Sequence, residues 1–585
     1  MTERILAFSD WFIIGIYLSI SLLLGIWFSK RAGKNTEEFF LSGRKLPWWI
    51  AGTAMVATTF AADTPLAVTE LVAQSGISGN WLWWSMAFGG MMTVFFFAPL
   101  WRRAGILTDL EFTEIRYHGK PAAFLRGFRA VYLGLFMNCI IMGWVNKAMI
   151  TIVGVVFPEM NPQLFILCSM AFVALYSSLS GQWGVAITDT FQFFFAMLGC
   201  IVLAWFALDH PSIGGIAGLK SQLVSSTFQL FPTIGETTIV GVLGLSLAAF
   251  LTYIGVIWWS SWYPGAEPGG GGYIAQRMMS AKDEKHALLS TLWFTIAHYC
   301  LRPWPWIIVA LVSLVLYPNL PPDHQRDGFV LVMKEVLPSG WYGLMIAAFM
   351  AAYMSTIATH LNWGASYIVN DVYNRFVNKT ATSNELVWSS RLTTFALMAI
   401  SFVVTQYLDT ISGAWKFILD CGAGIGLVLI LRWYWWRLNA WSEITAMIAP
   451  LVAFSLFSIY YPLVFPYSTL VITGITTISW LTVTFLTKPT DSDHLKAFYI
   501  KTYPSGPGWE KFRIELGIGG NGVPLFRLFK LWILGIGIVY GTLFASAEFI
   551  FSHFELAITY TAIVLFCSAM LKWDYEKFGW DFIKD

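Results

Sequence analysis

Ala57-Thr-Thr-Phe-Ala-Ala-Asp-Thr-Pro-Leu-Ala67 forms the centre of an apolar run, residues 49–75, that is long enough to cross a membrane. Pro65 has no amide donor, so it frees a backbone carbonyl near Ala61 among small and hydroxylated side chains. Broken helices of this kind line binding sites in secondary transporters, because their backbone groups face an ion or a solute. A simple proline kink packed by its neighbours is the structural alternative.

The composition of the whole chain agrees with a membrane environment. Apolar residues make up 57% of the 585 residues and charged residues only 12%, about half the charged fraction of a soluble globular protein. The formal net charge of +2 gives no reason to expect a nucleic-acid partner. All six cysteines lie inside apolar runs, which indicates small core residues and no disulfide framework. We therefore predict an all-α polytopic protein whose solvent is the lipid bilayer.

Runs of sufficient length and apolarity recur along nearly the whole chain. The first is followed at once by Lys30 and Arg31, with no small-residue cleavage signature, so it is interpreted as a retained helix. No gap is long enough for a soluble catalytic domain. The sequence predicts about fifteen transmembrane helices, near residues 11–29, 49–75, 81–101, 131–157, 163–180, 185–208, 237–263, 288–317, 340–369, 392–408, 414–431, 441–462, 466–487, 531–551 and 555–571.

The distribution of basic residues predicts the orientation of these helices. If the N-terminus is outside, the inside loops carry 29 of the 36 Lys and Arg residues and the outside segments carry four. Basic residues concentrate in cytoplasmic loops. We therefore predict an integral protein of the plasma (inner) membrane, with the N-terminus outside and the C-terminus in the cytoplasm.

Charged and titratable residues within the predicted spans are candidates for function, because an ionised group at membrane depth costs at least a few kcal/mol. Lys416 and Asp420, four residues apart near a span's end, are expected to form a structural pair. Arg302 lies in an Arg-Pro-Trp-Pro segment, where it could bond carbonyls that the prolines leave free. The full set is Asp63, Glu70, Lys147, Asp189, His298, Arg302, His360, Lys416 and Asp420.

Two segments carry oxygen ligands suited to an alkali cation. The run 340–369 holds Ser355, Thr356 and Thr359, whose hydroxyls either coordinate an ion or bond back to their own helix. Asp189 opens the run 185–208 with no basic residue near it in sequence. An unpaired carboxylate there must be protonated or neutralised from outside the chain. A sodium ion is the simplest such partner.

An ordered set of motifs resembles the sodium/solute symporter family. The matching segments are Glu38-Phe-Phe-Leu-Ser-Gly-Arg-Lys-Leu-Pro-Trp-Trp49, Ser180-Gly-Gln-Trp-Gly-Val-Ala-Ile-Thr-Asp-Thr-Phe-Gln192, Gln276-Arg277, Met354-Ser-Thr356 with Asp371-Val-Tyr373, and Arg432-Trp-Tyr-Trp-Trp-Arg437. The resemblance covers about residues 8 to 490. Each motif alone is weak, but their order along the chain is specific.

The resemblance implies a LeuT-type core of two inverted repeats of five helices each. The implied divisions are an N-terminal extra helix and loop (1–48), the first repeat (49–208), an extracellular loop (209–236), the second repeat (237–431), two accessory helices (432–487), a cytoplasmic linker (488–530), and two C-terminal helices with a tail (531–585).

The resemblance also implies a sodium site between the first and eighth core helices. By position it would consist of the carbonyls of Ala57, Phe60 and Ala352 and the hydroxyls of Ser355 and Thr356. Asp189 matches the family's coupling aspartate, and with Thr359 it would form a second sodium or coupling site. Ala358, however, stands where members with a second sodium carry a hydroxyl.

The expected solute pocket departs from the family pattern, because Asp63-Thr64-Pro65 occupies positions where other members often have Glu-Gln or Gly-His. Lys147 could pair with a solute carboxylate or, without one, with Asp63 or Glu70. The tryptophans of the run Trp258–Tyr263 offer flat faces that suit sugar rings or anchor in the membrane interface. The candidate pocket residues are Thr59, Asp63, Thr64, Lys147, Trp259 and Trp262.

The predicted function is sodium-coupled symport of a small polar solute, a sugar, amino acid or carboxylate, by alternating access. Proton coupling through Asp189 or Asp63 is the alternative within the same class. A solute sensor without transport would normally carry a signalling domain, and none is recognised. An enzyme would need a convergent His, Asp or Ser constellation, which His298 and His360 alone do not make.

Overall fold

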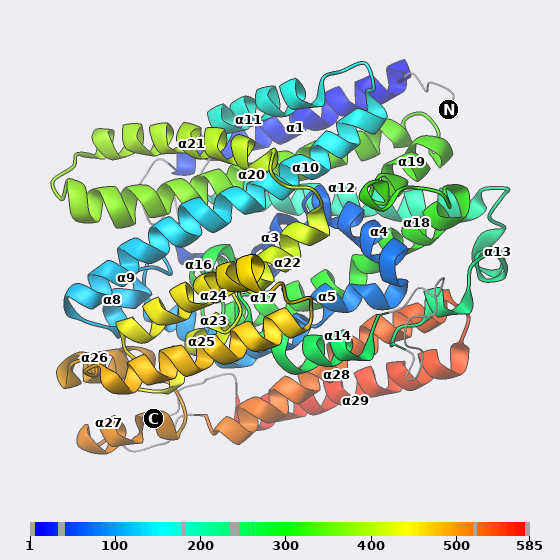
Figure 1. Cartoon of the computed structure of the whole chain (residues 1–585). Helices are drawn as coiled ribbons and strands as arrows, with labels where there is room; N and C mark the ends of the chain where they lie inside the picture. The colour runs from blue at the N-terminus through cyan, green and yellow to red at the C-terminus, as the bar shows by residue number, and fades with distance from the viewer. Residues whose placement is uncertain are drawn as a thin grey trace.

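The computed structural model describes residues 6–32, 41–177, 182–232, 245–263, 265–518 and 523–579. This part of the chain is helical and contains no strand, only one β-bridge between Leu46 and Ala281. Most helices run along one common axis (Figure 1). The described residues thus form the all-α bundle expected from the apolar runs.

The helices of the first predicted repeat follow an N-terminal helix, α1. The second apolar run is broken into α3 and α4 at residues 59–62, as the sequence around Pro65 predicts. Gly52 lets α3 approach α17, because a Cβ atom there would lie 2.6 Å from the Ser290 carbonyl oxygen. The elements are α1 (Phe8–Ala32), η1 (Ser42–Arg44), α3 (Trp48–Thr58), α4 (Asp63–Ser75), η2 (Ile77–Asn80), α5 (Trp81–Trp84), α6 (Ala87–Met92), η3 (Thr93–Phe97), α7 (Ala98–Ala104), α8 (Phe112–Arg116), α9 (Gly119–Val131), η4 (Tyr132–Met137), α10 (Asn138–Val156), α11 (Pro162–Ser177) and α12 (Gln182–Asp209).

The second predicted repeat also begins with a broken helix, since α15 ends at Ser260 and α16 begins at Gly272. Two broken helices at corresponding positions are the usual sign of a binding site at the interface of inverted repeats. The elements are α13 (Gly215–Gln222), η5 (Ser225–Phe228), α14 (Leu247–Thr252), η6 (Tyr253–Ile257), α15 (Trp258–Ser260), α16 (Gly272–Ser280), α17 (Glu284–Ile296), η7 (Ala297–Leu301), α18 (Pro303–Leu316), η8 (Pro322–His324), α19 (Asp327–Val336), α20 (Trp341–Ser366), η9 (Tyr367–Val377), α21 (Ser383–Thr405), α22 (Ile411–Cys421) and α23 (Ile425–Tyr434).

The remaining helices lie outside this core. Asn439 caps the first of them, α24. A capping box of Thr382 and Glu385 similarly begins α21 in the second predicted repeat. The two C-terminal helices pack against each other as a hairpin. The elements are α24 (Ala440–Tyr460), α25 (Tyr467–Leu486), α26 (Ser492–Thr502), η10 (Pro507–Trp509), α27 (Glu510–Glu515), α28 (Leu525–Ile550) and α29 (Phe554–Phe578).

Within the described residues, each of the fifteen predicted runs falls on a helix or a broken helix, while residues 178–180 and 237–244 of two runs lie outside the described part of the chain. Among the described residues, ten helices are long and apolar enough to cross a membrane, and the bent pair α22 and α23 makes an eleventh. The other four runs correspond to α1, the broken pair α3 and α4, α11, and the segment from α14 to α15. The count of fifteen spans therefore stays a prediction.

The two ends of the bundle carry different connections. Helices α8, α9, α26 and α27 lie at one end, and α13 and α19 lie at the other (Figure 1). The first group belongs to loops predicted to face the cytoplasm and the second to loops predicted to face outside. The arrangement agrees with the predicted alternation of the helices.

Candidate functional site

The breaks in the two interrupted helices face one small central cavity. Its volume is about 70 Å³, well below the roughly 300 Å³ of pockets that hold small molecules. In the conformation described here the site is therefore too narrow to hold a small organic molecule. The lining residues are Thr58, Thr59, Ala61, Asp63, Thr64, Trp83, Ile141, Trp144, Val145, Tyr263, Tyr273, His298, Arg302, Thr356, His360 and Trp415.

Backbone bonds partly close the break between α3 and α4. The carbonyl of Ala57 accepts from the amide of Phe60 at 2.9 Å, and the carbonyl of Ala61 accepts from the amide of Thr64 at 3.3 Å. Pro65 thus breaks the helix as predicted, but the Ala61 carbonyl does not stand free. A tight turn takes up the acceptor that the proline leaves without its usual partner.

Arg302, between η7 and α18, bonds to residues at the end of α3 and to His298, and not to carbonyls freed by its own prolines. Its Nη1 donates to the Val56 carbonyl and to the Thr59 hydroxyl, both at 3.2 Å, and its Nη2 lies 2.6 Å from His298 Nδ1. The expectation that it bonds carbonyls freed by the prolines of its own segment is wrong in this respect. A guanidinium only donates, so Nδ1 of His298 accepts and the imidazole is neutral.

Asp63 and His360 present polar atoms to the cavity. Asp63 is 4% exposed, and its Oδ1 has no hydrogen-bond partner within the described structure. Asn138 fixes the His360 ring, because its Nδ2 donates to the His360 carbonyl at 2.8 Å while its Oδ1 lies 2.7 Å from Nδ1. His360 Nδ1 therefore carries the proton, since the amide oxygen accepts.

Asp189 lies at the junction of α3, α12 and α20. Its carboxylate accepts from Ser355 at 2.5 Å and from Thr58 at 3.4 Å, and Arg277 Nη2 lies 3.5 Å away. The expectation of an unpaired carboxylate is wrong, because Arg277 on α16 pairs with it from 88 residues away in sequence. Asp189 is nonetheless buried.

Three threonine hydroxyls of α12 and α20 have no hydrogen-bond partner in the described part of the chain. They are the Oγ1 atoms of Thr188, Thr356 and Thr359. Buried polar atoms without partners are rare and call for an explanation, such as an ion. Like the Asp189 carboxylate, they are hard oxygen atoms of the kind that alkali and alkaline-earth cations prefer.

Other residues singled out from the sequence lie elsewhere. Lys147 is half-buried and does not line the cavity, and the charged groups that act on it are Arg326 and Asp409. Trp259 and Trp262 are likewise outside the lining: their indoles donate to the Gly255 carbonyl and to Glu267.

Two further acidic residues from the sequence bond to hydroxyls. Asp420 accepts from Thr469 at 2.5 Å and from Ser468 at 3.4 Å, and no ion pair with Lys416 forms among the described residues, so that expectation is wrong. Glu70 accepts from the Ser412 hydroxyl. Both oxygens of Asp420 are bonded, whereas Glu70 is bonded through Oε1 and its buried Oε2 has no hydrogen-bond partner in the described structure.

Sequence reasoning missed several residues of the site. Tyr263 and Tyr273 flank the second break, and Trp144 and Trp415 line the cavity from α10 and α22. The second Gly-rich segment, residues 265–272, signals a break between Tyr263 and Tyr273 and would have pointed to both. No local pattern points to Trp144 or Trp415.

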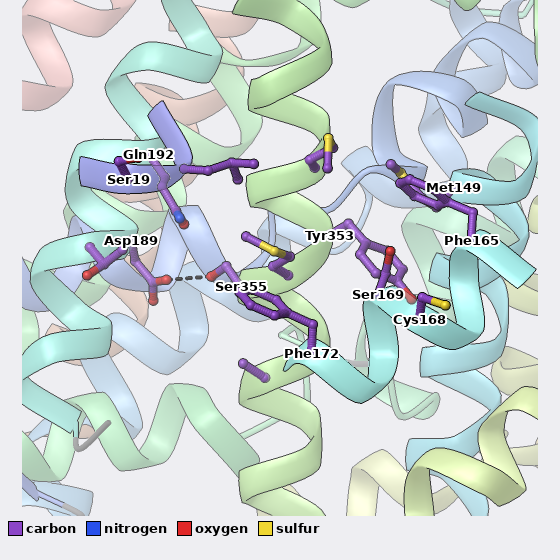
Figure 2. A pocket seen from close by; sticks show the side chains of 15 residues that line it. Ser19, Met149, Phe165, Cys168, Ser169, Phe172, Asp189, Gln192, Tyr353 and Ser355 are labelled. Atoms are coloured by element: carbon purple, nitrogen blue, oxygen red, sulfur yellow. Dashed lines mark hydrogen bonds between the residues drawn. The ribbon is translucent and has the colours of Figure 1, made fainter. Parts of the chain in front are cut away.

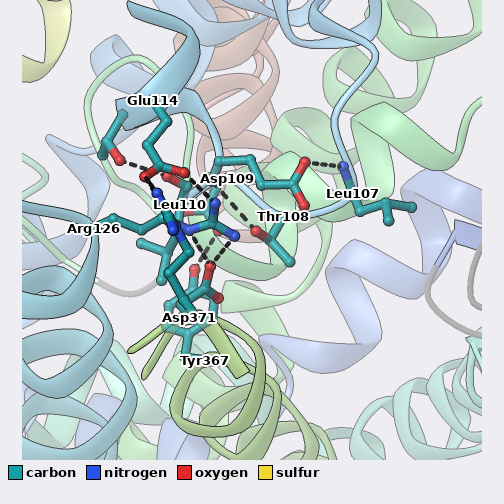
Figure 3. Close-up of polar contacts among 11 residues, drawn as sticks. Leu107, Thr108, Asp109, Leu110, Glu114, Arg126, Tyr367 and Asp371 are labelled. Atoms are coloured by element: carbon teal, nitrogen blue, oxygen red, sulfur yellow. Dashed lines mark hydrogen bonds and ion pairs between the residues drawn. The ribbon is translucent and has the colours of Figure 1, made fainter. Parts of the chain in front are cut away.

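A polar network links the segment around Asp109 and α8 to η9 and α9 (Figure 3). Asp109 accepts from the Tyr367 hydroxyl and from the amide of Gly272 at 3.1 Å, at the N-terminus of α16. A carboxylate at a helix N-terminus is favourable. The neighbouring residue, Tyr273, lines the cavity, so this contact ties the second broken helix to η9.

Ion pairs extend this network. Arg126 bonds to Glu114 and to Asp371, both at 2.6 Å, and Arg375 bonds to Glu114 at 2.9 Å. Partial burial raises the pKa of Glu114, but the bonds from Arg375 and Arg126 outweigh burial and hold that pKa below its usual value. The network joins α8, α9 and η9, so separating these elements would break several charged contacts.

Comparisons with known proteins agree with this geometry. The sequence model of the sodium:solute symporter family matches residues 39–450. The sodium/glucose cotransporter of Vibrio parahaemolyticus is 26% identical over 80% of this chain and 88% of its own. A sodium/mannose cotransporter of Bos taurus is 25% identical over 77% of this chain and 78% of its own.

A solved structure shares the fold. It is described as the substrate-bound outward-open state of a Na+-coupled sialic acid symporter with a novel Na+ site. The likeness has a TM-score of 0.65 at 18% identity and covers 83% of this chain and 99% of that one. The all-helical architecture expected from the sequence is thus confirmed.

Proposed function

Because this chain belongs to the sodium:solute symporter family, and is thus an integral membrane transporter that couples solute movement to sodium, we propose that its solute is a neutral sugar of hexose size. The observation that carries the proposal is the lining of the central cavity. Five aromatic rings surround one carboxylate and one guanidinium: Trp83, Trp144, Tyr263, Tyr273 and Trp415 with Asp63 and Arg302.

The chemistry of this lining suits a polyhydroxylated ring. Aromatic faces pack against the apolar face of a sugar, and a few placed polar groups orient it. Asp63 offers a carboxylate oxygen without a partner to the solute's hydroxyls, and the Arg302 charge balances it. Lys147, the cation that would favour a carboxylate solute, lies outside the lining. Both relatives described above are named for hexoses.

The sodium site of this proposal lies between α3 and α20. Its ligands are the carbonyls of Ala57, Phe60 and Ala352 and the hydroxyls of Ser355 and Thr356. Thr356 supports it, since its buried hydroxyl has no partner within the described structure and lines the cavity. Ser355 donates its hydroxyl proton to Asp189, and the lone pairs of its oxygen stay available to sodium.

Asp189 and Thr359 form a coupling position next to this site. Ser355 belongs to the proposed sodium site and contacts Asp189 at 2.5 Å. An ion bound by Ser355 therefore changes the hydrogen bonding of Asp189 and its balance with Arg277. A ligand shifts a conformational equilibrium only through different affinities for the two states, and this contact supplies such a difference.

The orientation follows the positive-inside rule. The end of the bundle with α8, α9, α26 and α27 faces the cytoplasm of the plasma membrane, and α1 begins on the outside (Figure 1). The Asp109 network then closes the cytoplasmic side of the cavity. Inward opening requires α16 to leave Asp109, and outward opening leaves the network intact.

Uptake by proteoliposomes tests the proposed solute. Glucose, mannose, an amino acid, sialic acid and a simple carboxylate would be supplied with an inward sodium gradient. Asp63→Asn should raise the half-saturating sugar concentration by about 10- to 150-fold, because hydrogen bonds to a charged group contribute about 1.5–3 kcal/mol. Lys147→Gln is the matched control and should leave it unchanged. Uptake of a carboxylate but of no sugar, together with loss of that uptake in Lys147→Gln, would contradict the neutral-sugar proposal.

A further inference from the structure

A second cavity, of about 400 Å³, lies on the far side of Asp189 from the central site. Figure 2 shows Asp189 and Ser355 on one of its walls and the side chains of α11 on the opposite wall. Ser355 and Asp189 of the proposed ion and coupling sites belong to its lining, and neither the solute site nor the sodium site accounts for the rest of it. Its lining residues come from α1, α10, α11, α12 and α20.

The surface of this cavity is mostly apolar. Met149, Met350 and Met354 line it with Phe165 and Phe172. Unbranched methionine side chains adapt to flexible apolar ligands.

Two of the polar residues in the lining direct their hydroxyls elsewhere. Tyr353 donates its hydroxyl to Asn146 at 2.8 Å and therefore presents its ring to the cavity. Ser19 donates to the Gly15 carbonyl of its own helix. Thr188 and Gln192 of α12 also line the cavity, and their Oγ1 and Oε1 atoms have no hydrogen-bond partner in the described structure. The methionine and phenylalanine part of the lining suits a hydrocarbon occupant better than water or a sugar.

The cavity opens sideways, within the hydrocarbon layer. Cys168, Phe172 and Ser19 at its rim are exposed, and their helices, α1 and α11, lie along one outer side of the bundle in Figure 1. Cys168 and Phe172 lie six and ten residues along α11 from Pro162, which is about 9 and 15 Å at the rise of a helix. A bilayer's hydrocarbon core is about 30 Å thick, so the opening faces acyl chains and not headgroups.

We propose that this cavity is a binding site for one acyl chain of a membrane phospholipid. The chain enters between α1 and α11, packs on the methionines and reaches the outer side of the Asp189–Ser355 contact. An apolar cavity of this size that is open to lipid is filled by hydrocarbon, because burial of each methylene group is favourable. The bound chain keeps water from Asp189 on this side.

Photo-crosslinking in nanodiscs tests the site. A phospholipid with a diazirine in its acyl chain would be activated and the labelled peptides mapped. We expect saturable labelling of the segments 162–177 and 350–358. Cys168→Trp, which fills the rim, should reduce it by about tenfold, the factor lost when roughly two methylene groups are displaced from an apolar site. Leu167→Trp is the control, because Leu167 is 40% exposed on the same helix but does not line the cavity.

Two results would overturn the proposal. Labelling of these segments no stronger than that of the exposed helix α29, or equal loss in both tryptophan variants, would indicate annular lipid only. The second measurement uses Cys168 itself, since the other five cysteines are buried. Rapid reaction of Cys168 with a charged, membrane-impermeant thiol reagent would show a water-filled vestibule. Protection of Cys168, reversed by removing bound lipid, supports the site.

Discussion

Tyr367→Phe removes one hydroxyl from the network that closes the cavity. The ring keeps its packing against Trp363, whose centroid lies 5.1 Å away, but the donor to Asp109 is lost. A hydrogen bond to a charged acceptor contributes about 1.5–3 kcal/mol. If that contact breaks on inward opening, the population of the opened state rises by about 10- to 150-fold.

Hydrogen–deuterium exchange in nanodiscs measures this change directly. The amide of Gly272 donates to Asp109, so the peptide covering residues 265–280 reports the opening. We expect its exchange to accelerate by a similar factor in Tyr367→Phe. Tyr540→Phe is the matched control, because that hydroxyl donates at 2.8 Å to the Trp84 carbonyl, outside the network. Equal exchange in wild type and Tyr367→Phe would refute the role of Asp109 as a closing contact.

Three further predictions concern the ion site and the charged network. Ser355→Ala combined with Thr356→Ala should raise the half-saturating sodium concentration steeply at unchanged expression, and unaltered sodium dependence would remove these ligands. Asp189→Asn should slow sodium-driven uptake more than it weakens solute binding, with Asp189→Glu retaining part of the activity. Normal sodium-driven uptake in Asp189→Asn would contradict the coupling role. Glu114→Gln should lower the melting temperature at neutral pH, because the lowered pKa of Glu114 contributes stability above its unfolded value of about 4.3. That difference should shrink as the pH falls through the lowered pKa, and a constant difference would argue against the ion pairs.

The elements of the fold were predictable because lipid imposes a simple length rule on apolar runs. The break near Pro65 was equally visible, since a proline in mid-span removes a donor wherever the chain later packs. The second break was harder to predict, because residues 261–271 contain a tryptophan as well as a Gly-rich segment. The tryptophans suggested solute contact or interfacial anchoring and drew attention away from the glycines that mark the break.

The partners of the buried charges were not predictable in the same way. Arg277 meets Asp189, and Arg302 meets Val56, across 88 and 246 residues. Each pair joins a broken helix to a helix far away in the sequence, and no local spacing predicts which helices will pack together. The predicted pair of Lys416 and Asp420 was wrong for the opposite reason. Two residues four apart on a helix can meet, but Asp420 instead accepts from hydroxyls of α25, which packs beside it.

The most direct test of the account is solute uptake by purified protein in proteoliposomes, with the ion gradients set independently. The account predicts that labelled hexose accumulates above its equilibrium level when sodium is higher on the side facing α13 and α19. It also predicts that a proton gradient of equal size, without sodium, does not drive accumulation. Accumulation driven by protons alone, or hexose equilibration that ignores both gradients, would contradict sodium-coupled sugar symport.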